Sequence, residues 1–265
     1  MNALEFDEMQ MYFGEDYKVN EYITIHPPTI GEIINFGEKR YFSMIHSLTC
    51  IPSDMKSQLF DMGIDYEEIS DYELFIMLSR TLKQDDTSII LGDLDLSKFE
   101  LGSNNNDQVI MYDPENNIII DELAYMKIAG YLRKYHGIKP KIEKAKNKTT
   151  KRLLIQLDRE DIARAKKTGY KSQLKTLVSA MMRYPGFKYK RNELAYCSYY
   201  EFIDTVYGAQ IYVSSTALLK GSYSGMIDTS KINKKEFNWM RSIDDDDNSN
   251  KGIVVENNDT NNKTK

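Results

Sequence analysis

Residues 198–221, SYYEFIDTVYGAQIYVSSTALLKG, decide how we expect the chain to fold. Ser198 followed by Glu201 matches a capping box, in which a hydroxyl and a carboxylate each bond an otherwise unpaired backbone amide at a helix start. Apolar residues then recur at helical spacings: Tyr199, Phe202, Ile203, Val206, Tyr207, Ile211, Val213, Ala217 and Leu218. Because Tyr200, Tyr212 and Leu219 widen this stripe beyond one face, we expect a helix with neighbours on all sides.

This stretch therefore predicts the centre of the fold. We expect a mainly α protein (α+β), a helical bundle around this central C-terminal helix, with the only tryptophan, Trp239, folding back on it. Each large side chain buried there contributes roughly 1.5–3 kcal/mol.

Composition indicates a globular chain without a membrane segment. Hydrophobic residues make up 41% of 265 residues, enough for a core. Cys50 and Cys197 are far apart and lack metal-ligand spacing, so two reduced thiols are expected. The chain opens with no signal peptide and contains no run of about 18 or more apolar residues. We expect a cytoplasmic protein that does not contact membranes.

The charges are strongly segregated along the chain. Residues 1–126 carry 7 Lys and Arg against 25 Asp and Glu, whereas residues 127–191 carry 20 against 4. The basic block binds either an external polyanion or the acidic half of its own chain or of a neighbouring copy. We favour the second reading, because an overall charge of −5 opposes nucleic-acid binding.

The amino-terminal half predicts helices and one β-hairpin. Further capping boxes start helices at Thr29, running to Leu48, and at Ser70. Residues 85–96 and the pair QVIMY and NIIID have β-rich composition, and a hairpin is expected near 108–121.

The predicted division of the chain has five parts. They are a loose acidic arm (1–20), an acidic helical lobe with the hairpin (21–137), a basic linker (138–150), a basic and aromatic helical lobe (151–241) and a disordered acidic tail (242–265).

Nothing in the sequence indicates a reaction centre. The three histidines are scattered, and no zinc spacing, EF-hand loop, phosphate-binding glycine loop or nucleophile elbow occurs. We therefore expect no catalytic residues, no metal and no cofactor. A protein that acts by binding remains, because 13 methionines and 19 tyrosines supply adaptable contact residues. The expected contact residues are Tyr200, Ile203, Tyr207, Tyr212 and Trp239.

A nucleic-acid-binding protein is the second alternative. It would use the 127–191 block, whose lysines alternate with tyrosines that could stack on bases. No established nucleic-acid-binding motif accompanies them.

A series of short motifs resembles a group of proteins encoded among the tail genes of long-tailed phages of Gram-positive bacteria. The motifs are PTIGEI, FGEKRYFSM, MGIDYEEISDYELF, GDLDLSKF, YLRKYHGIKPKIEKAKNKTTK, GFKY and LLKGSYSGMIDTSKINKKEFNWM, within about residues 22–241. By gene setting and helical character that group resembles tail assembly chaperones, which keep the tape measure protein soluble during tail assembly.

The resemblance implies a non-catalytic role in the host cytoplasm. The implied partners are the tape measure protein or the tail tube protein, and the chain could also associate with copies of itself. This chain is longer than compact chaperones, and the role does not require a β-hairpin. A structural tail or baseplate component, present in the virion, is therefore the first alternative.

Overall fold

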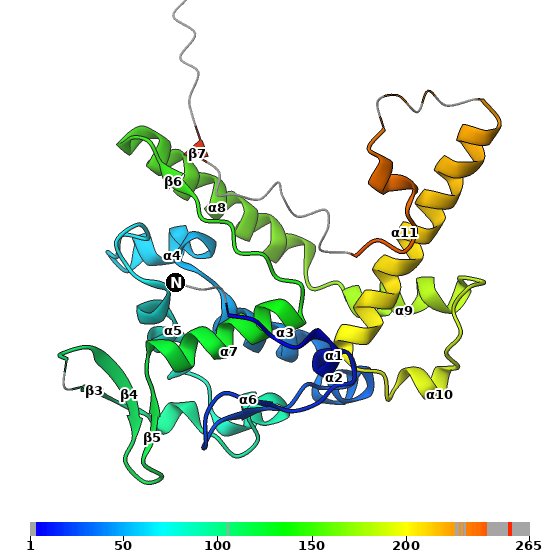
Figure 1. The fold of residues 1–265 in the computed structure, drawn as a ribbon. Helices are drawn as coiled ribbons and strands as arrows, with labels where there is room; N and C mark the ends of the chain where they lie inside the picture. The colour runs from blue at the N-terminus through cyan, green and yellow to red at the C-terminus, as the bar shows by residue number, and fades with distance from the viewer. Residues whose placement is uncertain are drawn as a thin grey trace, which may run out of the picture. The chain divides into compact units, whose positions relative to one another are not determined.

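A computed structural model describes residues 4–104, 106–225, 228, 230 and 232–242, together with the backbone of Val254–Val255. The fold is mainly α with small β-sheets, which confirms the predicted α+β class (Figure 1). The chain forms two compact units. The first comprises residues 1–41, 89–92 and 172–249, and the second comprises residues 42–88, 93–171 and 250–265.

The second unit contains helices around a small sheet. Its helices are α4 (Lys56–Asp61), α5 (Asp71–Ser79), α7 (Glu122–Tyr135), α8 (Lys148–Thr168), most of α3 (Glu38–Thr49), part of α6 (Gln84–Leu91) and the short η1 (Pro52–Asp54) and η2 (Leu96–Lys98). Strands β3 (Glu100–Ser103), β4 (Val109–Asp113) and β5 (Ile118–Ile120) pair antiparallel in that order. Strand β6 (Lys144–Ala145) pairs with β7 (Val254–Val255) in parallel.

The predicted hairpin near 108–121 is formed by β4 and β5. Met111 pairs with Ile120, and both are buried. The Tyr72 hydroxyl of α5 donates to the Ile120 carbonyl at 2.6 Å, which ties the sheet to the helices. The alternation of apolar residues was sufficient to predict these two strands, and β3 adds a third.

The first unit is built on contacts between distant segments. Its elements are α1 (Glu8–Tyr12), β1 (Tyr17–Lys18), β2 (Thr24–Ile25), α2 (Ile30–Phe36), α9 (Gln173–Arg183), α10 (Arg191–Leu194), α11 (Tyr199–Tyr223) and η4 (Lys234–Phe237). The amide of Gly31 donates to the Ala195 carbonyl at 2.9 Å, and a Cβ at Gly31 would lie 2.7 Å from that oxygen. Glycine is therefore required where α2 meets the turn before α11.

Two secondary-structure predictions were wrong. Residues 84–91 form helix α6, because acidic residues occupy its first turn and the buried Thr87 packs within it, and only β-branched composition had favoured a strand. The helix predicted from Thr29 to Leu48 is interrupted at Gly37, whose φ of +100° ends α2 before α3 begins.

The observed units differ from the predicted division of the chain. Ile155 of α8 joins a core cluster with Cys50, Leu59, Tyr66 and Leu74, so the segment after the predicted linker belongs with the acidic half. Residues 8–12, predicted as part of a loose arm, form α1 and bury Met11. The predicted disordered tail lies outside the described residues, except for Ser242 and the backbone of Val254–Val255.

Candidate protein-binding surface

Helix α11 begins at the residue that the sequence predicted. Ser198 is its N-cap, and the Ser198 hydroxyl accepts a hydrogen bond from the Glu201 amide at 3.1 Å. In a capping box the carboxylate would accept a hydrogen bond from the backbone amide of Ser198, but the Glu201 carboxylate has other donors. It accepts instead from the Tyr189 hydroxyl and, at 3.1 Å, from the Cys197 thiol. The start of α11 is thus held by the segment that precedes it.

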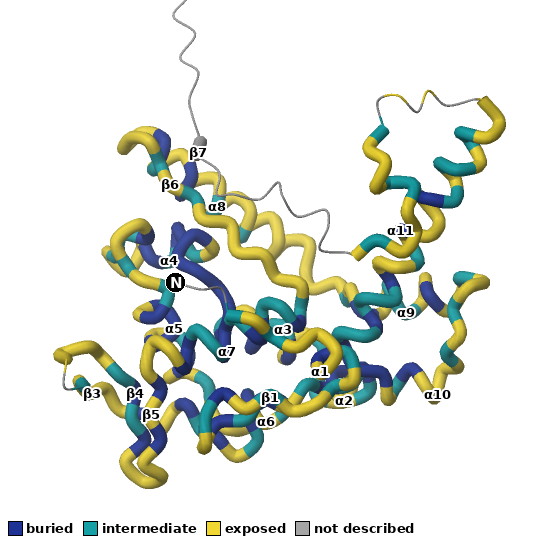
Figure 2. The backbone as a smooth tube through the Cα atoms, in the orientation of Figure 1, coloured by how far each residue is buried: buried dark blue, intermediate teal, exposed yellow. Residues whose placement is uncertain are grey.

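The prediction of a helix buried on all sides was wrong. Only five residues of α11 are buried: Tyr199, Phe202, Val206, Ile211 and Ser215. The other residues are half-buried or exposed, and exposed positions are more frequent in the second half of α11 than in the first (Figure 2). The apolar pattern shows that the helix has large contact residues, but it cannot show what covers them.

The buried face of α11 changes side along the helix. Tyr199, Phe202 and Val206 follow one stripe, whereas Ile211 and Ser215 follow another, because each residue turns the helix by about 100°. The second stripe is covered by the segment around η4. The Ser215 hydroxyl donates to the Glu236 carbonyl at 2.7 Å, which anchors that segment to α11.

Trp239 folds back on α11 as the sequence predicted. Its ring meets that of Tyr212 edge to face, with centroids 5.9 Å apart. An ion pair of 2.7 Å between Arg241 and Glu236 holds the same segment in place. Both rings remain about half exposed, 47% for Tyr212 and 51% for Trp239.

The five predicted contact residues divide into two faces. Tyr200, Ile203 and Tyr207 lie at spacings of three and four on one face, where Tyr200 and Ile203 are half-buried and Tyr207 is 47% exposed. Tyr212 lies about 140° around the helix from Tyr207 and joins Trp239 on the other face. The structure therefore contains two aromatic surfaces where one was expected.

Three further exposed residues were not among the predicted contacts. Val213, Tyr223 and Met240 are all more than half exposed. The signal for Val213 and Tyr223 was present in the sequence, because α11 has more apolar positions than one buried stripe can hold, whereas Met240 lies outside α11. The prediction missed them because it placed the whole helix in the interior.

The thiol at the base of α11, that of Cys197, is buried. Burial, with the neighbouring Glu201 carboxylate, raises the pKa of Cys197 well above its usual value. The hydrogen bond to Glu201 likewise raises the pKa of Tyr189. Both groups remain protonated at neutral pH and serve as donors that position Glu201.

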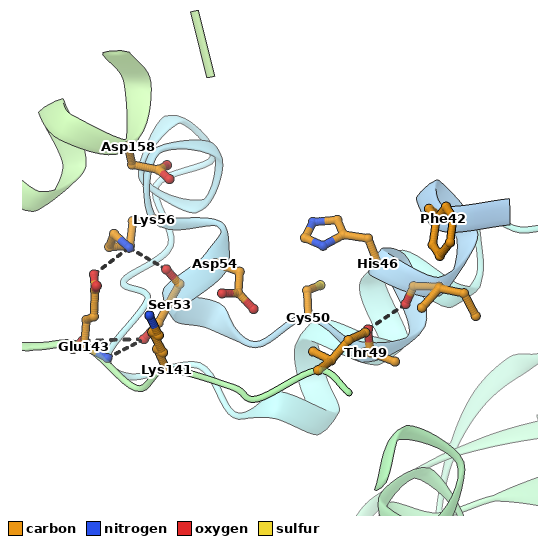
Figure 3. A pocket seen from close by; sticks show the side chains of 12 residues that line it. Phe42, His46, Thr49, Cys50, Ser53, Asp54, Lys56, Lys141, Glu143 and Asp158 are labelled. Atoms are coloured by element: carbon orange, nitrogen blue, oxygen red, sulfur yellow. Dashed lines mark hydrogen bonds and ion pairs between the residues drawn. The ribbon is translucent and has the colours of Figure 1, made fainter. Parts of the chain in front are cut away.

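The second unit has a pocket of about 530 Å³, lined by residues of α3, α4 and α8 and by the segment around Glu143 (Figure 3). At one end the Lys56 ammonium pairs with Glu143 at 2.8 Å and donates to the Ser53 carbonyl at 2.5 Å. At the other end lies Cys50, next to His46, and burial raises the pKa of Cys50 to about 12. Within the described residues, no group of three or more His, Cys, Asp and Glu is placed to hold a metal ion.

The basic block is paired with the acidic half of its own unit. Lys151 of α8 binds Asp65 and, at 2.7 Å, Glu67, and Arg159 binds Asp61. For Lys151 and Arg159 these ion pairs agree with the interpretation that we favoured for the segregated charges, namely neutralisation within the chain; other cations of the block, such as Lys166 and Lys167, are exposed.

Comparisons with known proteins add no relative. In the described part of the chain, no helix has both the length and the apolar character needed to cross a bilayer. The chain matches no protein-family model, no curated protein and no solved structure.

Proposed function

We propose that the protein is a non-catalytic phage tail assembly chaperone that binds the tape measure protein. The observation that carries the proposal is the half-exposed face of Tyr200, Ile203 and Tyr207 on α11. The tail setting rests on the resemblance of the short motifs. A tape measure protein is a long helical chain with apolar stripes, which require cover until the tail tube surrounds them.

The chemistry of this face suits reversible capture of a helix. Tyrosine offers a large apolar ring and a polar hydroxyl, and few rotatable bonds are immobilised on binding. Because Tyr200 and Ile203 are already half-buried, only part of their surface remains for a partner. The modest gain per site leaves the complex weak enough for tube subunits to displace the chaperone.

A structural tail or baseplate component remains the rival proposal. It would use the same adhesive surface but would stay in the virion at stoichiometric copy number. A nucleic-acid-binding role has less support, because Lys151 and Arg159 of the basic block already bind carboxylates of the same unit.

Co-expression of the full chain with the tape measure protein tests the proposal. We expect the chain to keep the tape measure protein in the soluble fraction, and Tyr207→Ser combined with Ile203→Ser to abolish this effect. A matched control is Tyr196→Ser, because Tyr196 is 83% exposed and lies outside α11. Loss of solubility with the control as well, or no rescue by the natural chain, would refute the proposal.

The virion supplies the second measurement. Mass spectrometry of purified particles should not find a chaperone among the stoichiometric proteins. Its presence at fixed copy number would end this proposal and support the structural tail component.

A further inference from the structure

The pocket of the second unit is built by segments that are distant in the sequence. It is lined by α3, by η1 and the start of α4, by residues 138–143 and by α8. The Glu143 amide donates to the Ser53 hydroxyl at 3.0 Å, and the Ser57 amide donates to Asp158 at 2.9 Å, so these segments are bonded to one another. The volume of about 530 Å³ lies within the range of roughly 300–1,000 Å³ that is typical of small-molecule sites.

Lys56 is a buried cation at one end of this pocket. Its side chain is only 10% exposed, and its ammonium donates to the Ser53 carbonyl at 2.5 Å and to the Glu143 carboxylate at 2.8 Å. An ammonium has three N–H bonds to donate, and no described residue accepts the third. Because a buried donor without an acceptor is unfavourable, this end of the pocket favours a ligand with an acceptor oxygen.

Two carboxylates of the pocket each have an oxygen that accepts from no residue in the described part of the chain. Asp158 accepts from the amide and the hydroxyl of Ser57, both through Oδ2. Asp54 accepts from the Ile51 amide at 2.9 Å, also through Oδ2. The Oδ1 atoms of Asp54 and Asp158 are therefore available to a donor group on a ligand.

The end of the pocket away from Lys56 is apolar. Figure 3 places Phe42 there, together with His46 of the same helix. Ile45 follows Phe42 by three residues on α3, so the two side chains lie on one face of the helix. An apolar group of a ligand is removed from water by contact with this face.

The charges of the pocket restrict the class of ligand. Two lysines, Lys56 and Lys141, and three carboxylates, those of Asp54, Glu143 and Asp158, line it. A ligand that carries only negative charge meets three carboxylates, and a ligand that carries only positive charge meets two ammonium groups. A zwitterion has a complementary group for both kinds of side chain.

We propose that this pocket binds an α-amino acid with an apolar side chain. The carboxylate of the amino acid accepts from Lys56 and from the exposed Lys141. Its ammonium donates to Asp158 and Asp54, and its side chain lies against Phe42. The pocket belongs to the second unit, whereas the proposed face for the tape measure protein lies on α11 of the first, so this inference does not depend on the proposed function.

Calorimetric titration of the full chain with L-leucine tests the proposal. We expect one L-leucine to bind per chain, and three analogues that each lack one group to bind about tenfold more weakly or worse. N-acetyl-L-leucine lacks the ammonium, L-leucinamide lacks the carboxylate and glycine lacks the apolar side chain. No binding of L-leucine at millimolar concentration, or equal binding of L-leucine and N-acetyl-L-leucine, would overturn the proposal.

Substitutions assign each group of the ligand to its partner. Asp158→Asn should weaken L-leucine binding about tenfold and leave N-acetyl-L-leucine binding unchanged, because only L-leucine has the ammonium. Asparagine keeps an oxygen that accepts from Ser57. The control Asp161→Asn, three residues further along α8 and outside the pocket, should leave both affinities unchanged. Equal effects of the two substitutions would contradict the assignment.

Lys141→Met supplies an independent test if Asp158→Asn disturbs the fold. Lys141 is exposed, so its loss should leave the urea midpoint unchanged. The substitution should weaken L-leucine binding but not L-leucinamide binding, because L-leucinamide has no carboxylate. An equal loss for both ligands would refute the proposed orientation. Neither pocket substitution should change the rescue of the tape measure protein, so failures of the two proposals are measured separately.

Discussion

Helices α8 and α11 both extend over many turns, yet they relate to their own units in opposite ways. Ten of the 21 residues of α8 are charged, against three of the 25 residues of α11. The charged helix is well accommodated, because its ion pairs reach Asp61, Asp65 and Glu67 while Leu154 and Ile155 are buried. The apolar helix leaves aromatic rings exposed, Tyr207, Tyr212 and Tyr223, whereas the exposed large side chains of α8 are two leucines, Leu153 and Leu157.

This difference shows that apolar content does not measure burial. A charge-rich helix can be anchored to its own unit when oppositely charged residues face it, as Lys151 and Arg159 are. An apolar helix whose rings stay exposed has contact surface left for a partner. In the proposed function the contact surface therefore lies on α11, whereas the ion pairs of α8 stabilise its own unit.

The largest effect should come from the buried stripe of α11. Phe202→Ala should lower the free energy of unfolding by about 3–5 kcal/mol, because the fully buried ring would leave a cavity. Tyr207→Ala, five positions along the same helix, should change it by no more than about 0.5 kcal/mol. Urea denaturation measures both. Equal losses would mean that Tyr207 is a core residue and that the comparison of the helices fails.

The second-largest loss of stability should come from the contact between Gly31 of α2 and the Ala195 carbonyl, just before α11. Gly31→Ala would place a Cβ 2.7 Å from the Ala195 carbonyl oxygen, and we expect a loss of about 1–3 kcal/mol. Alanine in an open helix position would instead stabilise by about 1 kcal/mol. The sign of the change in urea midpoint therefore decides whether α2 touches this turn, and Gly208→Ala serves as the open control.

On α8 the ion pairs should contribute less than the buried rings. Lys151→Met should cost about 1–2 kcal/mol, because it leaves Asp65 and Glu67 beside each other without their cation. Lys167→Met, at an exposed position of the same helix, should have almost no effect. Thermal unfolding at low and high salt measures the difference, and a loss that salt does not reduce would contradict an electrostatic origin.

The smallest effect should be on the loss of stability at acidic pH. The hydrogen bond from Lys151 lowers the pKa of Asp65; for Glu67, the bonds from Lys151 and Ala145 outweigh burial and also lower the pKa. A carboxyl with a lowered pKa stabilises the fold above its unfolded pKa of about 4, and this stability is lost as the pH falls through the folded pKa. In Lys151→Met the melting temperature should therefore fall less steeply below about pH 4 than in the natural chain. If it falls equally steeply, carboxyl groups other than those of Asp65 and Glu67 cause the acid sensitivity.

Much of the local structure could be predicted from short-range chemistry. Ser198, Thr29 and Ser70 cap the helices that they were expected to cap. The hairpin of β4 and β5 followed from alternation and turn residues. Residues 84–91 escaped prediction because a short apolar run with β-branched residues is compatible with either a strand or a helix, and its surroundings selected the helix.

The candidate surface could be predicted only in part. The sequence named Tyr200, Ile203, Tyr207, Tyr212 and Trp239 as expected contact residues, which stays a prediction, and it did not divide them into two separate faces. Their separation around the helix, and the position of Trp239 against Tyr212 alone, became clear from the coordinates.

The sequence by itself determined where α11 starts, which side chains it carries and that opposite charges are segregated along the chain. Only the tertiary structure decided which of those side chains are covered and which acidic residues neutralise α8. The physical reason is the sequence separation over which the interactions act. A cap or turn depends on atoms a few residues apart, whereas burial depends on segments that meet only after the chain has folded.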